Sequence, residues 1–243
     1  MQLENRKALV TGASRGIGKA IAIAFAEEGA DVAITGRRMD ALEDTRAAIE
    51  DLGRVCHAME WNVSDVSNTR ERLNEARDAL GGLDIVVNNA GVHHLPEEME
   101  GRPGSEADWD YVMDTNLKAV WFLTEEAARL MVRGGGAVIN IASDYAFRGG
   151  NSIYGVSKWG VRGLTRGLAQ KWAGKAVRIN GIGPGPVATS MSNWHEGDPL
   201  EREGLPLGRL TTPEEVARVA VFLASDDASA VIGETIVLNS GNS

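Results

Sequence analysis

Cysteine is almost missing from this sequence, since Cys56 is the single one among 243 residues. It cannot form an internal disulfide, so the fold does not depend on an oxidising compartment. No apolar run approaches the length of a membrane span, and residues 1–4 have no signal-peptide character. We therefore expect a soluble, cytoplasmic protein without a membrane partner.

Basic residues are outnumbered, with 25 Lys and Arg against 34 Asp and Glu. The formal net charge of −9 argues against a nucleic-acid partner, which would need clustered Lys and Arg. The sequence also lacks fixed-period repeats, low-complexity segments and linkers. Its length and apolar content suffice for one large buried core. We predict a single domain over residues 1–243.

Strand-like and helix-like segments alternate along the chain. Apolar runs predict strands at 7–10, 31–35, 55–61, 83–87, 137–141, 176–180 and 235–238. Helical spacing predicts helices at 17–29, 39–52, 66–80, 106–132, 154–173 and 213–223, the last N-capped by Thr212. Repeated β–α–β order is typical of a parallel sheet with helices on both faces. The predicted fold class is therefore α/β, a doubly wound parallel sheet.

A glycine-rich turn follows the first predicted strand, with the sequence Thr11-Gly12-Ala13-Ser14-Arg15-Gly16-Ile17-Gly18. Glycines let the backbone approach a pyrophosphate, and the N-terminus of the next helix supplies oriented N–H groups. Glycines also mark plain turns. Here the flanking strand and helix give the context that a phosphate-binding loop requires.

Two arginines, Arg37 and Arg38, follow Gly36 at the end of the second predicted strand. In a dinucleotide fold this strand end meets the adenosine ribose, where an acidic residue would bind a free 2′-hydroxyl. Arginines instead favour a 2′-phosphate, and Arg15 adds a third positive charge from the glycine-rich turn. The alternative is a solvated basic turn. We interpret the three arginines as a site for NADP(H).

Tyr154 and Lys158 stand four residues apart, on one face of a predicted helix. A neighbouring ammonium lowers the pKa of a phenol, which is ordinarily about 10. The pair can therefore donate and accept a proton near neutral pH. The same spacing is common on ordinary surface helices, so its meaning depends on the rest of the chain.

Polar residues also mark the ends of two later strands. Asn88-Asn89-Ala90-Gly91 and Ser143 both stand at the carboxyl edge of the predicted sheet, where ligands bind in open α/β folds. Asn116 lies inside a predicted helix, where Asn is mildly unfavourable. It has either a specific use or simply a hydrogen bond to its neighbours.

His93 and His94 open an acidic loop that runs to residue 108. Neighbouring side chains in an extended chain point in opposite directions, and no Cys or second His-rich segment completes a metal site. We expect no metal here, and we interpret residues 93–108 as a pocket rim.

In this order the motifs resemble the short-chain dehydrogenase/reductase family, with Pro184-Gly185 as a further match. The resemblance covers almost the whole chain. It implies one Rossmann-type domain with seven parallel strands, a nicotinamide cofactor, and a homotetramer or a dimer. Two features depart from the family: the spacing from Ser143 to Tyr154 is shorter than usual, and residues 238–241 replace the commoner Asp-Gly-Gly.

The resemblance also implies roles for individual residues. Ser143 would hydrogen-bond the substrate's carbonyl oxygen, and Tyr154 would pass it a proton as hydride arrives. Lys158 would hold the nicotinamide ribose and lower the pKa of Tyr154, while Asn116 would anchor a proton-relaying water. The implied NADP(H)-binding residues are Gly12, Ser14, Arg15, Gly16, Ile17, Gly18, Arg37, Arg38, Asn62, Val63, Asn89, Ala90, Gly91, Tyr154, Lys158, Pro184, Gly185, Val187 and Thr189.

We predict an NADP(H)-dependent oxidoreductase of the ketoreductase or alcohol dehydrogenase type, which interconverts a small-molecule carbonyl and a secondary alcohol. Dehydration, epimerisation or carbon–carbon double-bond reduction on the same fold forms a second class. Enoyl reductases of this superfamily space Tyr and Lys more widely. A non-catalytic NADP(H)-sensing protein is the third class, but such proteins tend to lose one of the two residues.

Residues 190–207 are predicted to form a substrate-binding lid. The segment contains Gly197, Pro199, Gly204 and Pro206, has few apolar anchors and carries several charges. Its own stability should therefore be low. Substrate differences are expected here and in the rim at 93–108.

Overall fold

The computed structural model describes residues 1–97, 99–148 and 150–242. Glu98, which belongs to the predicted pocket rim at 93–108, lies outside the described residues, as do Gly149 and Ser243. The described strands form one parallel sheet in the order β3-β2-β1-β4-β5-β6-β7. They are β1 (Lys7–Thr11), β2 (Asp31–Gly36), β3 (Cys56–Glu60), β4 (Ile85–Asn88), β5 (Gly136–Ile141), β6 (Val177–Pro184) and β7 (Thr235–Leu238).

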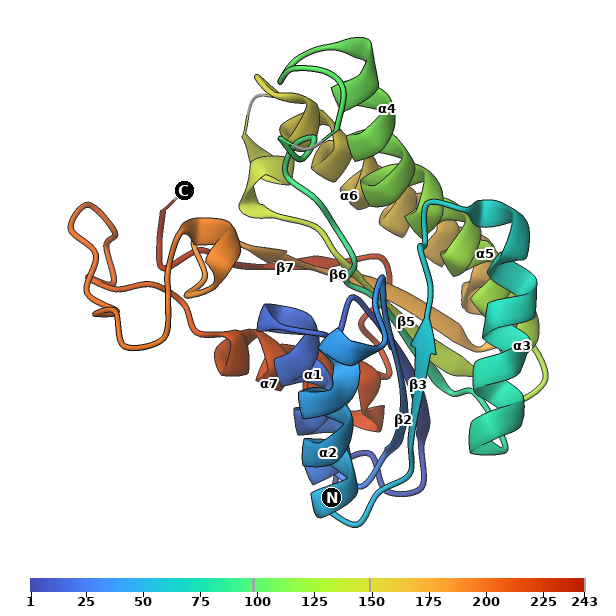
Figure 1. The fold of residues 1–243 in the computed structure, drawn as a ribbon. Coiled ribbons are helices and arrows are strands. Elements are labelled where there is room, and N and C mark those ends of the chain that lie inside the picture. Colours follow the sequence, from blue (N-terminus) through green and yellow to red (C-terminus); the bar gives the residue numbers. More distant parts are fainter. Residues whose placement is uncertain (98, 149, 243) are drawn as a thin grey trace.

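Helices cover both faces of the sheet (Figure 1). One face carries α1 (Gly16–Glu27), α2 (Glu43–Asp51) and α7 (Pro213–Ala224), and the other carries α3 (Thr69–Leu80), α5 (Ala119–Met131) and α6 (Ile153–Trp172). The predicted doubly wound α/β sheet is therefore confirmed. No helix among the described residues is both long and apolar enough to cross a membrane.

The strands read as continuous apolar runs because both faces of the sheet are covered. Successive side chains point to opposite faces, and each face has its own apolar core. In β1, Val10 joins the core beneath α1 and α7, whereas Leu9 joins the core beneath α5 and α6. Strand β6 continues beyond its predicted end at residue 180 as far as Pro184, because its last residues pair with β7.

The helix predicted at 106–132 is present but is not uniform. It begins as α4 (Glu106–Met113), passes through a π-helical turn at Asp114–Lys118, and continues as α5. Such turns often occur at functional sites. Asn116 lies inside this turn, in the middle of the long helical segment as predicted.

Residues 190–207 stand apart from the two helical layers, as the orange segment on the left of Figure 1 shows. Apart from a 3₁₀ turn at Ser190–Ser192 and one residue in an isolated β-bridge, Glu201, the segment is irregular. It has internal contacts, such as the Trp194 indole N–H, which donates to the carbonyl of Asp198 at 3.1 Å, and an antiparallel bridge joins Glu201 to Arg209. The far end is attached to the body, where Leu207 donates its N–H to Ser240.

Candidate active site

A cavity of about 290 Å³ opens at the carboxyl edge of the sheet. Most of the predicted cofactor residues line it: Gly12, Ser14, Arg15, Gly16, Ile17, Gly18, Arg37, Asn62, Val63, Asn89, Ala90, Gly91, Tyr154, Lys158, Pro184, Gly185, Val187 and Thr189. Residues that the sequence did not single out also line it, among them Trp61, Tyr111, Thr115 and Met191. Arg38, Asn116 and Ser143 are not part of this lining.

The glycine-rich turn has the shape that its sequence predicts. Gly12 and Gly16 adopt positive φ values of 66° and 56°, which glycine adopts without steric cost. A Cβ atom at Gly12 would lie 2.8 Å from the Cα of Ala90. The Asn89 side chain donates to the carbonyls of Thr11 and Gly12 at 2.9 and 3.0 Å. The ends of β1 and β4 are therefore joined directly beneath the turn.

The N-terminus of α1 is open to a ligand. Ser105, Ser152 and Thr212 cap α4, α6 and α7 with side-chain hydrogen bonds. No side chain of the described residues caps α1, and its first turn contains no acidic residue. Free N–H groups and the positive end of the helix dipole attract an anion. Because Arg15, Gly16 and Gly18 line the cavity at this point, the residues present fit the pyrophosphate of a nicotinamide dinucleotide.

Tyr154 and Lys158 lie together at the other end of the cavity. The Lys158 ammonium lies 5.6 Å from the centre of the Tyr154 ring and donates to the carbonyl of Ile141 at 2.9 Å. Lys158 is only 4% exposed, and burial lowers its pKa to about 8. Both side chains line the cavity, as the resemblance implied.

The net shift of the Tyr154 pKa is opposite in direction to the one that the resemblance implied. Burial raises the pKa of Tyr154 to about 12, and the charge of Asp144 adds to the rise. The neighbouring Ser143 hydroxyl acts in the opposite direction and lowers this pKa. Loss of hydration around the phenolate therefore outweighs the attraction of nearby groups, so the phenol keeps its proton at neutral pH.

Ser143 is buried beside Tyr154, and its hydroxyl faces a carboxylate. It donates to Asp144 at 3.2 Å and accepts the Tyr145 N–H at 3.2 Å. Asp144 is also paired with Arg148 at 2.6 Å, and Arg148 donates to the carbonyl of Asn242. The loop after β5 is thus fastened to the C-terminal residues.

The Asn116 side chain bonds to the protein. Its amide oxygen accepts the Val92 N–H at 2.8 Å, and its amide nitrogen donates to the Val92 carbonyl at 2.8 Å and to Ser157 at 3.2 Å. It therefore fixes the chain just after Gly91, beside Lys158. The implied water relay stays a prediction.

His93 packs against the candidate acid, a contact that the sequence did not reveal. The centre of the His93 ring lies 4.8 Å from the centre of the Tyr154 ring. The Tyr145 ring packs edge to face against Tyr154, with 5.9 Å between the two ring centres. The available signal was its position two residues after Gly91. The described residues contain no group of three or more His, Cys, Asp or Glu placed to hold a metal.

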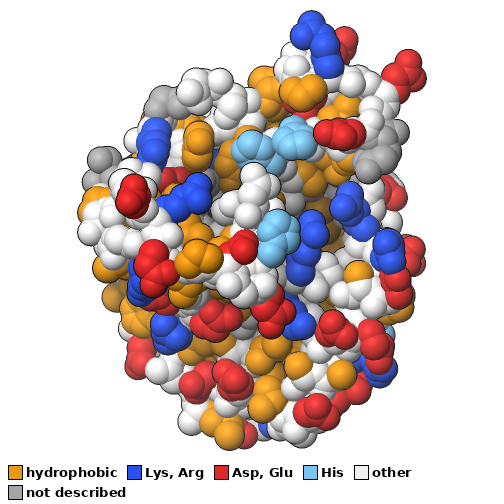
Figure 2. All heavy atoms as spheres, turned by 60° about the vertical axis from the view of Figure 1, so that its left-hand side comes forward, with side chains coloured by type: hydrophobic (Ala, Val, Ile, Leu, Met, Phe, Trp, Pro, Cys, Tyr) orange, Lys and Arg blue, Asp and Glu red, His pale blue; other side chains and the backbone are white. Residues whose placement is uncertain are grey.

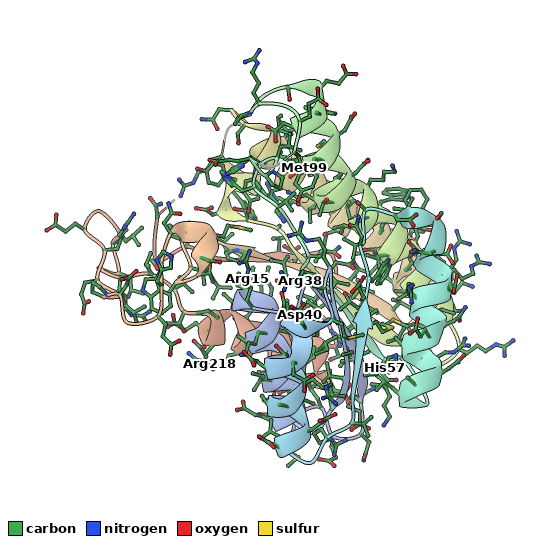
Figure 3. The ribbon with its side chains drawn as sticks, in the orientation of Figure 1. Arg15, Arg38, Asp40, His57, Met99 and Arg218 are labelled. Carbon is green, nitrogen blue, oxygen red and sulfur yellow. The ribbon has the colours of Figure 1, made fainter. Side chains whose placement is uncertain are left out.

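The two arginines after β2 differ in their contacts. Arg37 lines the cavity and donates to the Tyr111 hydroxyl at 3.1 Å. Arg38 forms a forked pair with Asp40, and Figure 3 places this pair where α2 begins, with Arg15 at the start of α1. The predicted cofactor contact of Arg38 thus has no support from its position. On the face shown in Figure 2, Lys and Arg side chains gather beside a His side chain near the middle, and further His side chains lie above them.

Comparisons with known proteins show the family of this chain. A family model described as "Enoyl-(Acyl carrier protein) reductase" matches residues 12–243. A curated relative, 3-oxoacyl-(acyl-carrier-protein) reductase FabG of Thermotoga maritima, is 35% identical over 248 residues, covering 99% of this chain and 99% of that protein.

Solved structures show the same fold. A candidate short-chain alcohol dehydrogenase from Sinorhizobium meliloti has a TM-score of 0.90 at 41% identity, covering 99% of this chain and 97% of that one. A candidate 2-deoxy-D-gluconate 3-dehydrogenase from Agrobacterium tumefaciens with bound NADP has a TM-score of 0.86 at 37% identity, covering 99% and 97%. A 7α-hydroxysteroid dehydrogenase complexed with NADH has a TM-score of 0.87 at 30% identity, covering 99% and 95%. This chain therefore belongs to the short-chain dehydrogenase/reductase family of oxidoreductases.

Proposed function

We propose that the protein is an NADP(H)-dependent ketoreductase or alcohol dehydrogenase. One observation carries the proposal: the same cavity is lined at one end by the protonated phenol of Tyr154 and the buried Lys158. At the other end it is lined by Arg37 and the uncapped N-terminus of α1. The cavity therefore combines a site for a phosphorylated dinucleotide with a proton donor.

The bound nicotinamide would supply or accept the hydride, which is the cofactor's own chemistry. The protein's residues handle the proton and the developing charge. Tyr154 is protonated at neutral pH, so it can donate its proton to the substrate oxygen as an alkoxide develops. Ser143 would turn its hydroxyl from Asp144 to the same oxygen. Lys158 has N–H groups beyond the one donated to Ile141, and these remain for the ribose.

Carbonyl reduction is favoured over double-bond reduction. The matching family model carries an enoyl reductase description, yet the four-residue step from Tyr154 to Lys158 differs from the wider spacing of those enzymes. FabG is described as a 3-oxoacyl reductase, which acts on a carbonyl. Dehydration, epimerisation and cofactor sensing are the alternatives that activity must separate.

Arg37 and Arg15 favour NADP(H), because a 2′-phosphate would meet two cations and no acidic residue follows β2 until Asp40. One solved relative has NADP bound and another has NADH, so relatives alone do not decide the cofactor.

The test is a panel of ketones, keto acids and enones, with NADPH or NADH consumption followed by absorbance. We expect turnover of at least one carbonyl compound, with NADPH preferred by about 10- to 100-fold in kcat/KM. Consumption with enones alone, or a preference for NADH, would contradict the proposal.

The cytoplasmic location and the homotetramer stay predictions. We further propose that residues 190–207 close over the site. The segment's internal contacts, such as Trp194 to Asp198, are consistent with movement as a unit. Hydrogen exchange with and without NADPH tests this. Protection should appear in this segment on binding, whereas equal and strong protection in both states would show a fixed wall.

A further inference from the structure

Two neighbouring arginines at the end of β2 make different contacts. Both carboxylate oxygens of Asp40 accept hydrogen bonds from Arg38. Arg37 forms no ion pair within the described part of the chain, and its one side-chain hydrogen bond there goes to the neutral Tyr111 hydroxyl at 3.1 Å. Arg37 is therefore a cation that remains available to an anionic ligand.

Tyr111 reaches Arg37 from a distant element. It belongs to α4, 74 residues further along the chain, and both side chains line the cavity. Thr115, about one turn beyond Tyr111, lines the cavity as well, so this face of the helix forms one wall. The hydrogen bond thus joins the end of β2 to that wall.

The bond restricts an otherwise free side chain. Arg37 is exposed, and an exposed arginine loses considerable rotamer entropy when it binds a ligand. A guanidinium has five N–H donors in a fixed plane, so the one donor used by Tyr111 leaves others for a phosphate. Holding the group before binding reduces the entropy lost on binding.

We propose that Tyr111 is a positioning residue for cofactor choice, which holds the Arg37 guanidinium where the 2′-phosphate of NADP(H) binds. The inference rests on the proposed NADP(H) dependence. It assigns the selectivity to Arg37 with Tyr111 and excludes Arg38, although Arg37 and Arg38 look equivalent in the sequence.

The test compares adenosine 2′,5′-bisphosphate with AMP by calorimetry, since both occupy the adenosine end and only one carries the 2′-phosphate. Tyr111→Phe removes the hydroxyl and keeps the ring. We expect this variant to bind the bisphosphate about 3- to 10-fold more weakly and to bind AMP with unchanged affinity. Arg37→Ala should weaken the bisphosphate more, and Arg38→Ala is the matched control that should change neither ligand.

A double variant isolates the positioning role. In an Arg37→Ala background, Tyr111→Phe should have no further effect on the bisphosphate, because nothing is left to position. Three outcomes would overturn the inference. Tyr111→Phe could weaken bisphosphate binding fully even without Arg37, it could weaken AMP binding equally, or it could leave bisphosphate binding unchanged. If the wild type binds the bisphosphate no more tightly than AMP, the NADP(H) proposal fails first, and this outcome is distinguishable from the others.

Discussion

The two ends of the cavity are built in opposite ways. At the end with Tyr154 and Lys158 the polar groups are buried: Lys158, in the lining, is 4% exposed, and Ser143, just behind it, is 5% exposed, and both bond to other protein groups. At the other end, where we propose that the adenosine binds, Arg15 and Arg37 are exposed. Burial shifts pKa values and fixes positions, which the chemistry requires. Exposed charges select a ligand while adding little to stability. Substitutions should therefore affect rate and stability at one end and cofactor choice at the other.

The largest effect is expected for Tyr154→Phe. Losing the proton donor should lower kcat by about 10²- to 10⁴-fold. NADPH affinity should barely change, because the phenol belongs to the reaction end. Single-turnover rates and NADPH titration measure the two quantities separately. Turnover close to the wild-type value would remove Tyr154 from the mechanism.

The buried ammonium of Lys158 should make stability depend on pH. Its pKa is about 8 in the folded protein and about 10.4 in an unfolded chain. Between these values the unfolded chain holds a proton that the folded chain lacks, so stability rises with pH. Over this window wild type should gain about 2–3 kcal/mol relative to Lys158→Met.

Urea unfolding of both proteins at several pH values between 8 and 10 gives this difference directly. Other titrating groups are common to both and cancel. Parallel stability curves would show that burial does not lower the pKa of Lys158 in the folded protein.

Gly36→Asp probes the adenosine end. Its carboxylate would repel a 2′-phosphate and accept a hydrogen bond from a free ribose hydroxyl, so we expect NADH to be preferred. A Cβ at Gly36 would lie 3.1 Å from Cδ2 and 3.3 Å from Cγ of the buried Leu42, so this side chain must shift by a few tenths of an ångström in any variant with a Cβ at this position.

Gly36→Ala is the matched control, since it adds the same Cβ without the charge. The kcat/KM with NADPH divided by the kcat/KM with NADH should fall by about 10- to 100-fold in Gly36→Asp. The same ratio should stay nearly constant in Gly36→Ala. A ratio that falls equally in both variants would point to shape instead of charge.

The smallest effect is expected at a helix end outside the cavity. Thr212 and Glu215 form a reciprocal capping box on α7, whereas α1 has no such cap. Thr212→Ala should lower the free energy of unfolding by about 1 kcal/mol and leave cofactor affinity unchanged. Thr212→Ser keeps the hydroxyl and should behave as wild type. A loss of cofactor affinity in Thr212→Ala would contradict the prediction that the N-terminus of α7 affects stability alone.

The sequence predicted most of the fold because its apolar runs alternate regularly. It also predicted the glycine-rich turn, where Gly12 needs a positive φ, and it brought Tyr154 and Lys158 together through helix geometry. Local patterns such as these determine local structure without knowledge of distant contacts.

Three features were not predicted from the sequence. Burial reversed the expected pKa shift of Tyr154, and a sequence pattern does not give the depth of a side chain. Arg38 pairs with Asp40 and Arg37 bonds to Tyr111, although the two arginines look alike in the sequence. The contact between Tyr111 and Arg37 joins elements 74 residues apart, which no local spacing could reveal.

The strand order has a consequence for the time course of folding. Strand β1 pairs with β2 on one side and with β4 on the other, so the turn after β1 gains its supports from Asn89 only when β4 has joined. Pairing of distant strands is slow in general. The proposed dinucleotide site is therefore incomplete until this strand is in place. Cofactor binding would then act late, by shifting the last steps toward the folded state through mass action.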